Sequence, residues 1–436
     1  MGYILGGLCI VAAFYGYYKY RFIFNPITSM FFIWGIILSI SELGLYSTVV
    51  PSDKFYLIAA FGLLAFFLGT LLGSKDIRIT LGKRNVATYS GLRSKQSVYT
   101  INYNLMYILG AISLIYYFIQ LAVVVRLLLS GYDYSYIRTL AVSVDENGLN
   151  SSQLFTVLYN FIASPTTYLL IALLPIEIFF GKRKKLFIAE CIMVMVLFVL
   201  TTGGRSVILW FGIYLLLVFL LYCKFNKINN IRISKKYKRL LIVCGIALFM
   251  FLFYMTLSRR SGDVDFVKEI FLYFVAPLPH ADHYFDVVDK SGKYGYGVSS
   301  FYGLLYPFFF LLRLIGIFNG YPEFITEIRY MSFDMMETGY YIGGGIYMNA
   351  FVTAFYQPYL DGRYLGVFII MLLFGFVCNL YFVRAYKEKD VKAMLIYCLL
   401  LQKVIFSFVR FYFTQQAQSL CFLLAFLAIR RGFKQL

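Results

Sequence analysis

Residues 186–223 read LFIAECIMVMVLFVLTTGGRSVILWFGIYLLLVFLLYC and decide the fold class of this chain. The apolar runs 186–202 and 207–223 are each long enough to cross a bilayer as a helix, which takes roughly 17–25 residues. The Gly-Gly pair between them indicates a tight turn, so this segment predicts two successive spans. The spans are expected to be helical because lipid offers no partner to an open backbone.

The composition extends this pattern to the whole chain. Of 436 residues, 61% are hydrophobic and 14% are charged, whereas about a quarter of the residues in a soluble domain are charged. We therefore expect a single integral-membrane domain over residues 1–436, an all-α polytopic protein with about eleven transmembrane helices. The expected spans are 2–18, 24–47, 55–73, 105–129, 155–180, 186–202, 207–223, 240–257, 365–383, 393–413 and 416–429.

The charges predict how the chain is oriented. The net charge is +19, but the basic residues gather in alternate short loops, which indicates cytoplasmic loops rather than a nucleic-acid surface. Residues 74–104 and 224–239 are the main basic cytoplasmic loops, the N-terminus is expected outside, and the C-terminus is expected in the cytoplasm. The long acidic stretch 258–364, between the eighth and ninth spans, is then a large external loop. Within it, the apolar segment 301–318 is expected to be interfacial or re-entrant, because Arg313 lies in its middle.

Arginines near the external face are the first candidates for function. Arg205 lies in the turn TTGGRS (201–206), where a guanidinium could bind a diphosphate through two parallel hydrogen bonds. Arg259 and Arg260 follow the expected span 240–257 and run against the acidic bias of their loop. The alternative for each of these three arginines is a snorkelling side chain that anchors a helix end in the interface.

Cations within or near the apolar segments form a second group. Lys403 and Arg410 are seven residues apart and are expected on one face of a single helix, and Arg126 lies near the outer end of its span. A charge in hydrocarbon costs about 2.5–3.5 kcal/mol on insertion scales, so it usually faces a cavity or a partner. The alternative is pairing with an acid such as Glu42. Two further candidates for substrate binding lie in the external loop: Arg313, and Arg329, which follows Ile328.

The external loop also contains both histidines of the chain. His280 and His283 are three residues apart, hence on one face if the segment is helical, and either could act as a general base near neutral pH. A structural hydrogen bond is the alternative, and the external carboxylates compete for the role of base. Tyr284 and Tyr347 belong to a tyrosine-rich set that could stack on sugars, although an interfacial aromatic belt has the same composition.

Other chemistries are not indicated. The seven cysteines all lie in apolar segments without a CxxC pair, so we expect neither disulfides nor a metal site. No P-loop, dinucleotide fingerprint, HExxH or GxSxG occurs in a fitting context, so no cofactor is expected.

Three features resemble the Wzy-type O-antigen and capsular polysaccharide repeat-unit polymerases. They are the TTGGRS turn, the large external loop before the last spans, and the passage from GGGIYMNAF (343–351) to LGVF (365–368). The resemblance implies a GT-C-like glycosyltransferase of the bacterial cytoplasmic membrane that uses glycans linked to undecaprenyl diphosphate. It implies no metal or nucleotide sugar in the site, and candidate protein partners are a flippase and a chain-length regulator.

Together these observations predict a polymerase of lipid-linked repeat units. Arg205, Arg259, Arg260 and Arg410 would stabilise the departing lipid diphosphate, and His280 or His283 would take the proton of the attacking hydroxyl. Three alternatives stay open from sequence alone: a flippase for lipid-linked oligosaccharides, an O-antigen ligase and a non-catalytic membrane assembly protein. A flippase needs charge along its whole path, whereas here the charge gathers near one face.

Overall fold

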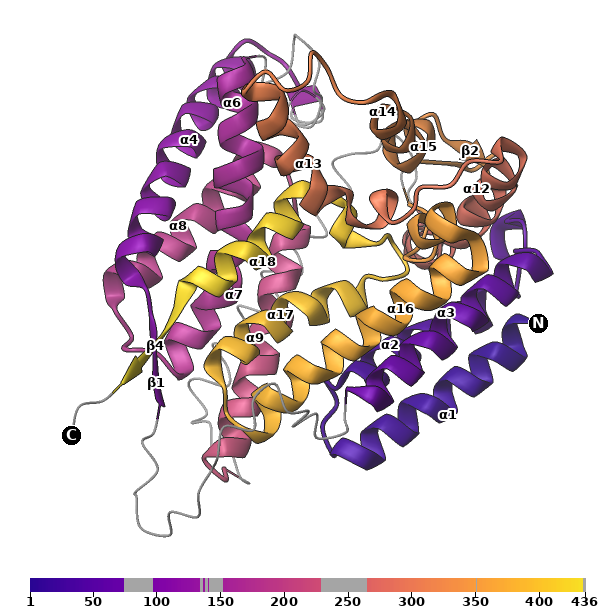
Figure 1. Cartoon of the computed structure of the whole chain (residues 1–436), viewed down its shortest axis with the longest axis horizontal. Helices are drawn as coiled ribbons and strands as arrows, with labels where there is room; N and C mark the ends of the chain where they lie inside the picture. Colours follow the sequence, from indigo (N-terminus) through magenta and orange to yellow (C-terminus); the bar gives the residue numbers. More distant parts are fainter. Residues whose placement is uncertain are drawn as a thin grey trace. The chain divides into compact units, whose positions relative to one another are not determined.

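The computed structural model describes residues 1–73, 97–133, 136, 137, 140, 152–228, 265–349 and 351–433, and these residues are mainly helical (Figure 1). They form two compact units. The first contains Met1–Asn102 and Phe271–Leu436, and the second contains Tyr103–Ile270. The prediction of an all-α polytopic membrane protein is confirmed; the described strands form only two short two-stranded ribbons.

Six helices in the described part of the chain are long and apolar enough to cross a membrane. They are α3 (Asp53–Leu72), α4 (Tyr103–Leu129), the α6–α7 helix (Gln153–Phe179), α8 (Lys185–Thr202), α9 (Ser206–Phe225) and α16 (Tyr356–Lys387). The other predicted spans overlap with α1 (Gly2–Tyr20), α2 (Pro26–Ser41), α17 (Val391–Ile405) and α18 (Gln416–Ala428), of which α2 and α17 end before the predicted spans do. The predicted span 240–257 lies outside the described residues. The total of eleven spans therefore stays a prediction.

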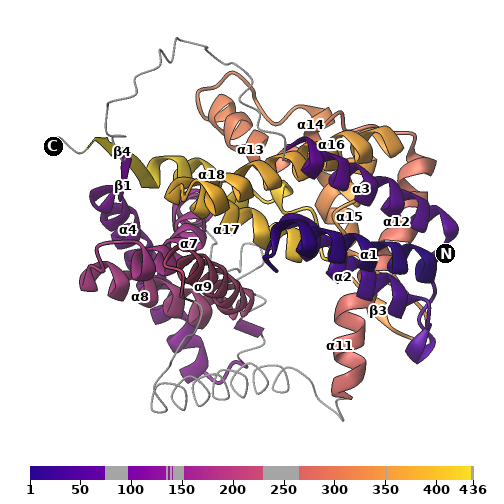
Figure 2. The same ribbon diagram turned by 90° about the horizontal axis from the view of Figure 1, so that it is seen from below.

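The first unit is built on close packing between helices, and Figures 1 and 2 show α1, α2, α3 and α16 side by side. Glycines permit the approach of α3 to α16. A β-carbon at Gly69 would collide with the backbone of Leu372, and one at Gly375 would collide with the backbone of Phe66. Small residues commonly serve this purpose between membrane helices, where no hydrophobic force drives helix association.

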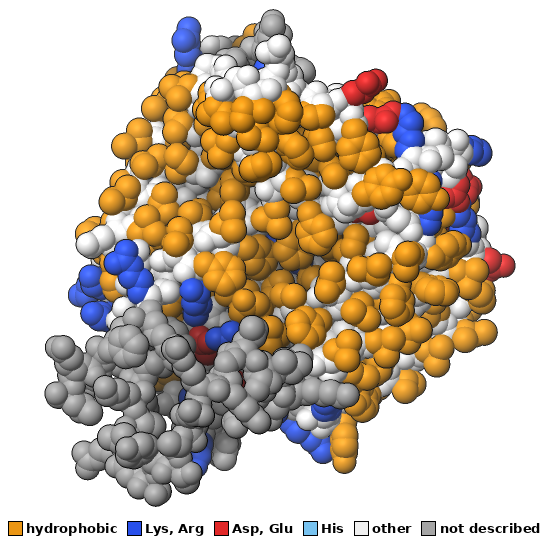
Figure 3. Space-filling model, in the orientation of Figure 1, with side chains coloured by type: hydrophobic (Ala, Val, Ile, Leu, Met, Phe, Trp, Pro, Cys, Tyr) orange, Lys and Arg blue, Asp and Glu red, His pale blue; other side chains and the backbone are white. Residues whose placement is uncertain are grey.

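Apolar and charged side chains separate on this unit. In Figure 3, hydrophobic side chains cover the face over α1 and α3, whereas lysine, arginine, aspartate and glutamate gather near α12 (Pro277–Ser291) and α14 (Glu323–Arg329). A continuous apolar exterior of this kind suits contact with lipid, because a water-soluble surface rarely exposes such large patches.

The described residues of the predicted external loop, 265–349 and 351–364, form helices and one hairpin before α16 begins. These elements are α11 (Phe266–Val275), α12, α13 (Val298–Leu314), α14, the π-helical turn η3 (Tyr330–Asp334), α15 (Met335–Glu337), β2 (Tyr340–Tyr341) and β3 (Tyr347–Met348). The hairpin between β2 and β3 turns at Gly343–Gly345, where all three residues have positive φ. A side chain at Gly343 would collide with the Ser47 carbonyl of the short helix η1 (Leu45–Ser47), so glycine is required for this contact.

Helix α16 starts earlier than the predicted span at 365–383, and it is interrupted. It begins at Tyr356, and its backbone leaves the helical conformation at Gly362 and Arg363, where Arg363 has φ 52°. The carboxylate of Asp361, just before the break, accepts hydrogen bonds from the backbone N–H groups of Ser299 and Ser300 at 2.9 and 2.8 Å. These hydrogen bonds connect the interrupted part of α16 to the start of α13.

The prediction of one continuous helix over 393–413 is wrong. Helix α17 ends at Ile405, and the following backbone pairs with residues 352–354 instead, because Ala354 donates its N–H to the Ser407 carbonyl at 2.6 Å. The Ser407 hydroxyl accepts a hydrogen bond from the buried indole of Trp34 at 2.8 Å. Lys403 and Arg410 therefore do not share a helical face, since Arg410 lies beyond the helix and bridges to Thr353.

The second unit contains α4, α6 (Gln153–Leu158), the π-helical turn η2 (Tyr159–Ala163), α7 (Ser164–Phe179), α8 and α9. Two hydrogen bonds between buried polar side chains connect its helices. Tyr103 donates its hydroxyl to Glu177 at 2.7 Å, and the hydroxyls of Tyr117 and Thr167 lie 2.9 Å apart.

In the first unit, β1 (Ser97–Ile101) pairs antiparallel with β4 (Ile429–Phe433).

Candidate active site

A small polar cavity in the first unit contains Arg410. Its volume is about 40 Å³, and its walls are Ser332, Phe333, Met336, Glu337, Gln357, Arg410 and Thr414. The cavity thus brings together one cation, one carboxylate and several uncharged polar groups from three separate parts of the chain, 332–337, Gln357 and 410–414. A cavity of this size admits a few water-sized groups, so a whole oligosaccharide must lie mainly outside it.

The Arg410 side chain is held in place by its neighbours. Its backbone bridges to Thr353, and its guanidinium lies 5.6 Å from the centre of the Phe351 ring. Arginine on an aromatic face keeps its planar fork of N–H donors available for an anion. The local break after α17 is therefore what turns Arg410 toward the cavity.

Two further groups define the chemistry of the cavity. Glu337 ends the short helix α15 and is exposed to solvent. Gln357 lies in the first turn of α16 with 2% of its surface exposed, and its side-chain oxygen has no hydrogen-bond partner within the described residues. An unpaired buried acceptor costs about 1–3 kcal/mol, so a donor on a bound ligand would be favoured at this position.

His280 lies behind the segment that carries Phe351. Both histidines belong to α12, so the segment is helical, but His280 is fully buried. Its Nδ1 lies 2.7 Å from the Phe351 carbonyl oxygen, which assigns the proton to Nδ1 and leaves Nε2 buried without a partner in the described part of the chain. Burial lowers the pKa of the His280 imidazole from 6.5 to about 4, so the ring is neutral. This geometry positions Phe351 beneath Arg410.

The other two aromatic candidates of α12 make structural contacts. The ring of His283 stacks on Tyr340 with centroids 3.7 Å apart, and burial lowers its pKa. Tyr284 donates its hydroxyl to the Met335 carbonyl at 3.0 Å, and its ring contacts both histidines. These contacts connect α12 to the hairpin and to α15, and hence to the wall that carries Glu337.

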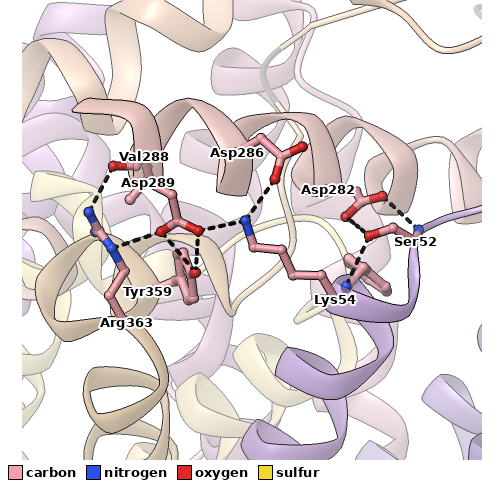
Figure 4. A network of polar contacts seen from close by, with 9 residues as sticks. Ser52, Lys54, Asp282, Asp286, Val288, Asp289, Tyr359 and Arg363 are labelled. Atoms are coloured by element: carbon pink, nitrogen blue, oxygen red, sulfur yellow. Dashed lines mark hydrogen bonds and ion pairs between the residues drawn. The ribbon is translucent and has the colours of Figure 1, made fainter. Parts of the chain in front are cut away.

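A charged network lies on the exposed side of α12 (Figure 4). Asp289 accepts from Lys54 at 2.6 Å, from the Arg363 Nε at 2.9 Å and from the Tyr359 hydroxyl at 3.0 Å. Lys54 also bonds to Asp286 at 2.7 Å, and Arg363 donates to the Val288 carbonyl at 2.7 Å. Sequence reasoning missed Arg363 and Asp289. The available signal was the Asp361-Gly362-Arg363 step immediately before an apolar run.

Lys403 does not line the Arg410 cavity. It is 3% exposed, donates to Gln418 at 3.0 Å, and lies 4.9 Å from the centre of the Phe422 ring. Three other cationic candidates, Arg126, Arg313 and Arg329, lie at exposed positions. Arg126 lies in the last turn of α4 beside an apolar depression, Arg313 lies 5.4 Å from the Tyr321 ring, and Arg329 lies 4.0 Å from Asp334.

Tyr347 and Arg205 complete the predicted set. Tyr347 donates its hydroxyl to the Thr338 carbonyl within the hairpin region. Around Arg205 the predicted turn is confirmed, because α8 ends at Thr202, Gly203 adopts φ 61°, and α9 begins at Ser206. Arg205 belongs to the second unit, and Arg259 and Arg260 lie outside the described residues.

Within the described ranges, no three histidine, cysteine or acidic side chains converge as a metal site.

A comparison with protein families gives one match that covers almost the whole chain. The family model described as O-antigen polysaccharide polymerase Wzy matches residues 1–434. Neither a curated protein nor a solved structure matches the chain.

Proposed function

The chain belongs to the O-antigen polysaccharide polymerase Wzy family, and we propose that it joins repeat units carried on undecaprenyl diphosphate at the outer face of the membrane. Its apolar helices and its family make it a multi-pass protein of the bacterial inner membrane that polymerises lipid-linked oligosaccharide repeat units. The finer proposal concerns the donor, the side of the membrane and the residues that carry the transfer. The observation that carries it is the cavity shared by Arg410 and Glu337.

Arg410 binds the diphosphate of the donor lipid. When the anomeric carbon of the growing glycan leaves its phosphate oxygen, negative charge develops on the lipid diphosphate. A guanidinium can meet two phosphate oxygens with parallel hydrogen bonds, and a fixed donor of this kind stabilises the charge as it forms. The volume of about 40 Å³ suits this assignment, because the cavity needs to admit only the phosphate end of the donor.

Glu337 takes the proton of the attacking hydroxyl. The acceptor oxygen forms a new bond to the anomeric carbon, the bond from that carbon to the phosphate oxygen breaks, and the acceptor proton passes to the carboxylate. Of the two kinds of base expected from sequence, the carboxylate lies in the cavity, whereas His280 is fully buried against Phe351. His280 thus acts as a positioning residue for the aromatic face under Arg410.

The orientation is part of the same proposal. Residues 258–364 lie outside, the basic loops 74–104 and 224–239 lie in the cytoplasm, and the transfer occurs at the outer leaflet. Arg205, Arg259 and Arg260 are further candidates for contact with phosphate, and the fold is expected to be GT-C-like. Labelling of single engineered cysteines from either side of the membrane checks the orientation directly.

Complementation of a host strain that lacks its own copy of this gene tests the function. The wild-type chain restores long surface glycans, whereas Arg410→Ala and Glu337→Gln leave single repeat units at normal expression. Arg384→Lys, at the far end of α16, is the matched control and restores long chains, because Arg384 pairs with Asp390 away from the cavity. Long chains in the Arg410→Ala strain would refute the proposal. Accumulation of lipid-linked long chains in the deletion strain would instead identify a ligase.

A further inference from the structure

Three exposed aromatic rings stand in a row at a second place in the first unit. The ring centroids of Tyr294 and Tyr296 are 6.0 Å apart, and those of Tyr296 and Phe324 are 6.4 Å apart, with interplanar angles of 30° and 34°. The side chains are 42%, 79% and 41% exposed, respectively. They come from the turn between α12 and α13 and from the start of α14, so the fold brings them together from separate segments.

The backbone holds this row in place. Gly295 donates its N–H to the Leu360 carbonyl at 2.9 Å, and Tyr296 donates to the Asp361 carbonyl at 3.1 Å. Tyr296 adopts φ 50°, a left-handed conformation that is unfavourable for a residue with a β-carbon. A strained backbone that presents a large ring to the outside is characteristic of binding sites, because packing alone does not require it.

Charged hydrogen-bonding groups border the rings. The Arg363 guanidinium lies 4.6 Å from the centre of the Tyr294 ring and is paired with Asp289. Its Nη1 is buried and has no partner within the described residues. Lys293, which precedes Tyr294 in the chain, forms an ion pair with Glu327, three residues after Phe324. Flat aromatic faces with carboxylate and guanidinium groups beside them match a sugar ring, whose apolar face stacks while its hydroxyls donate and accept hydrogen bonds.

We propose that Tyr294, Tyr296 and Phe324 form a carbohydrate-binding platform that holds part of the glycan away from the Arg410 cavity. The identity of the ligand as the chain's own glycan rests on the proposed function. The first two turns of α16 connect the two sites, since Gln357 lines the cavity and Tyr359 bonds to Asp289 beside the platform. A polymerase must hold a long product near the site of each new bond, and this platform supplies the second point of contact.

Hydroxyl-radical footprinting distinguishes the platform from an aromatic belt in the lipid interface. The full chain is placed in a nanodisc and exposed to radicals with and without a short oligosaccharide released by mild acid from the host's own surface polymer. The platform predicts that Tyr294 and Tyr296 are oxidised without the oligosaccharide and protected with it. If they resist oxidation without the oligosaccharide, they are covered by lipid; if the oligosaccharide does not protect them, they do not bind it. Either result overturns the proposal.

Substitutions test the same site by affinity. The double variant Tyr296→Ala with Phe324→Ala should bind the oligosaccharide about tenfold more weakly by titration calorimetry, because two stacking faces are lost. Tyr296→Phe keeps the ring and should bind almost as well as wild type. Tyr330→Ala is the matched control, since Tyr330 is 52% exposed and lies outside the row. Unchanged affinity in the double variant would overturn the platform.

The length of the product separates this inference from the proposed function. The double variant should still form the first glycosidic bond but should make shorter chains, because Arg410 and Glu337 are intact. Wild-type chain lengths from the double variant, together with an inactive Arg410→Ala protein, would reject the platform and keep the proposed function. Normal polymerisation by Arg410→Ala, together with oligosaccharide protection of the platform, would reject the function and keep the binding site.

Discussion

Replacing Asp289 by asparagine should destabilise the first unit by about 2 kcal/mol. The carboxylate receives donors from Lys54, Arg363 and Tyr359, and the two cationic side chains are only 25% and 15% exposed. An exposed ion pair contributes at most about 1 kcal/mol, whereas removing one partner from a buried pair costs about 3–5 kcal/mol. Asp289 is itself 41% exposed, so the expected loss lies between these limits.

The measurement is equilibrium unfolding of the purified protein in mixed micelles with increasing SDS, followed by circular dichroism. Asp286→Asn is the matched control, on the same helix and three residues away. Asp286 is 60% exposed and contacts Lys54, which keeps Asp289 as a partner, so its loss should cost less than about 0.5 kcal/mol. Equal destabilisation by the two variants would show that the contacts with Arg363 and Tyr359 contribute nothing, and the reasoning would be refuted.

Two other changes test the surroundings of the site. Because the folded pKa of His280 is about 4 and its ordinary value is 6.5, the unfolded chain binds more protons between these values. The free energy of unfolding of the wild-type protein should therefore fall by about 2–3 kcal/mol as pH drops from 6.5 to 4. His280→Gln should remove this part of the pH dependence. Parallel curves of unfolding free energy against pH for the two proteins would contradict this expectation. Gly343→Ala should cost at least about 2 kcal/mol, because φ is 100° and the β-carbon would meet Ser47. Gly345→Ala, with positive φ but open space around it, should cost about 1 kcal/mol, and equal losses by thermal denaturation would show that the contact is unimportant.

Local chemistry explains what the sequence could predict. The turn at Gly203 followed from two apolar runs separated by glycines, because a left-handed residue there ends one helix and lets the next begin. Arg410 was a candidate because an arginine in an apolar run needs a cavity or a partner, and it does line a cavity. Hydrophobicity and the cost of burying charge act over a few residues, so a single chain reveals them.

Long-range contacts explain what the sequence could not predict. The end of α17 at Ile405 depends on pairing with residues 352–354 and on Trp34, which is far away in the chain. The apolar run 393–413 gave no local sign of this break. The partners of Asp289 come from α3 and α16, so its role depends on tertiary packing, whereas in the sequence it adds only to the acidity of a loop.

The rate of the first bond formed tests the central claim most directly. In nanodiscs supplied with the lipid-linked repeat unit, the appearance of the two-unit product is followed for the wild-type chain and for Arg410→Lys. Lysine keeps the charge but cannot meet two phosphate oxygens in one plane, so the rate should fall by about 10²–10³ while substrate binding changes little. A wild-type rate with lysine at this position would contradict the assignment of Arg410 to the departing diphosphate.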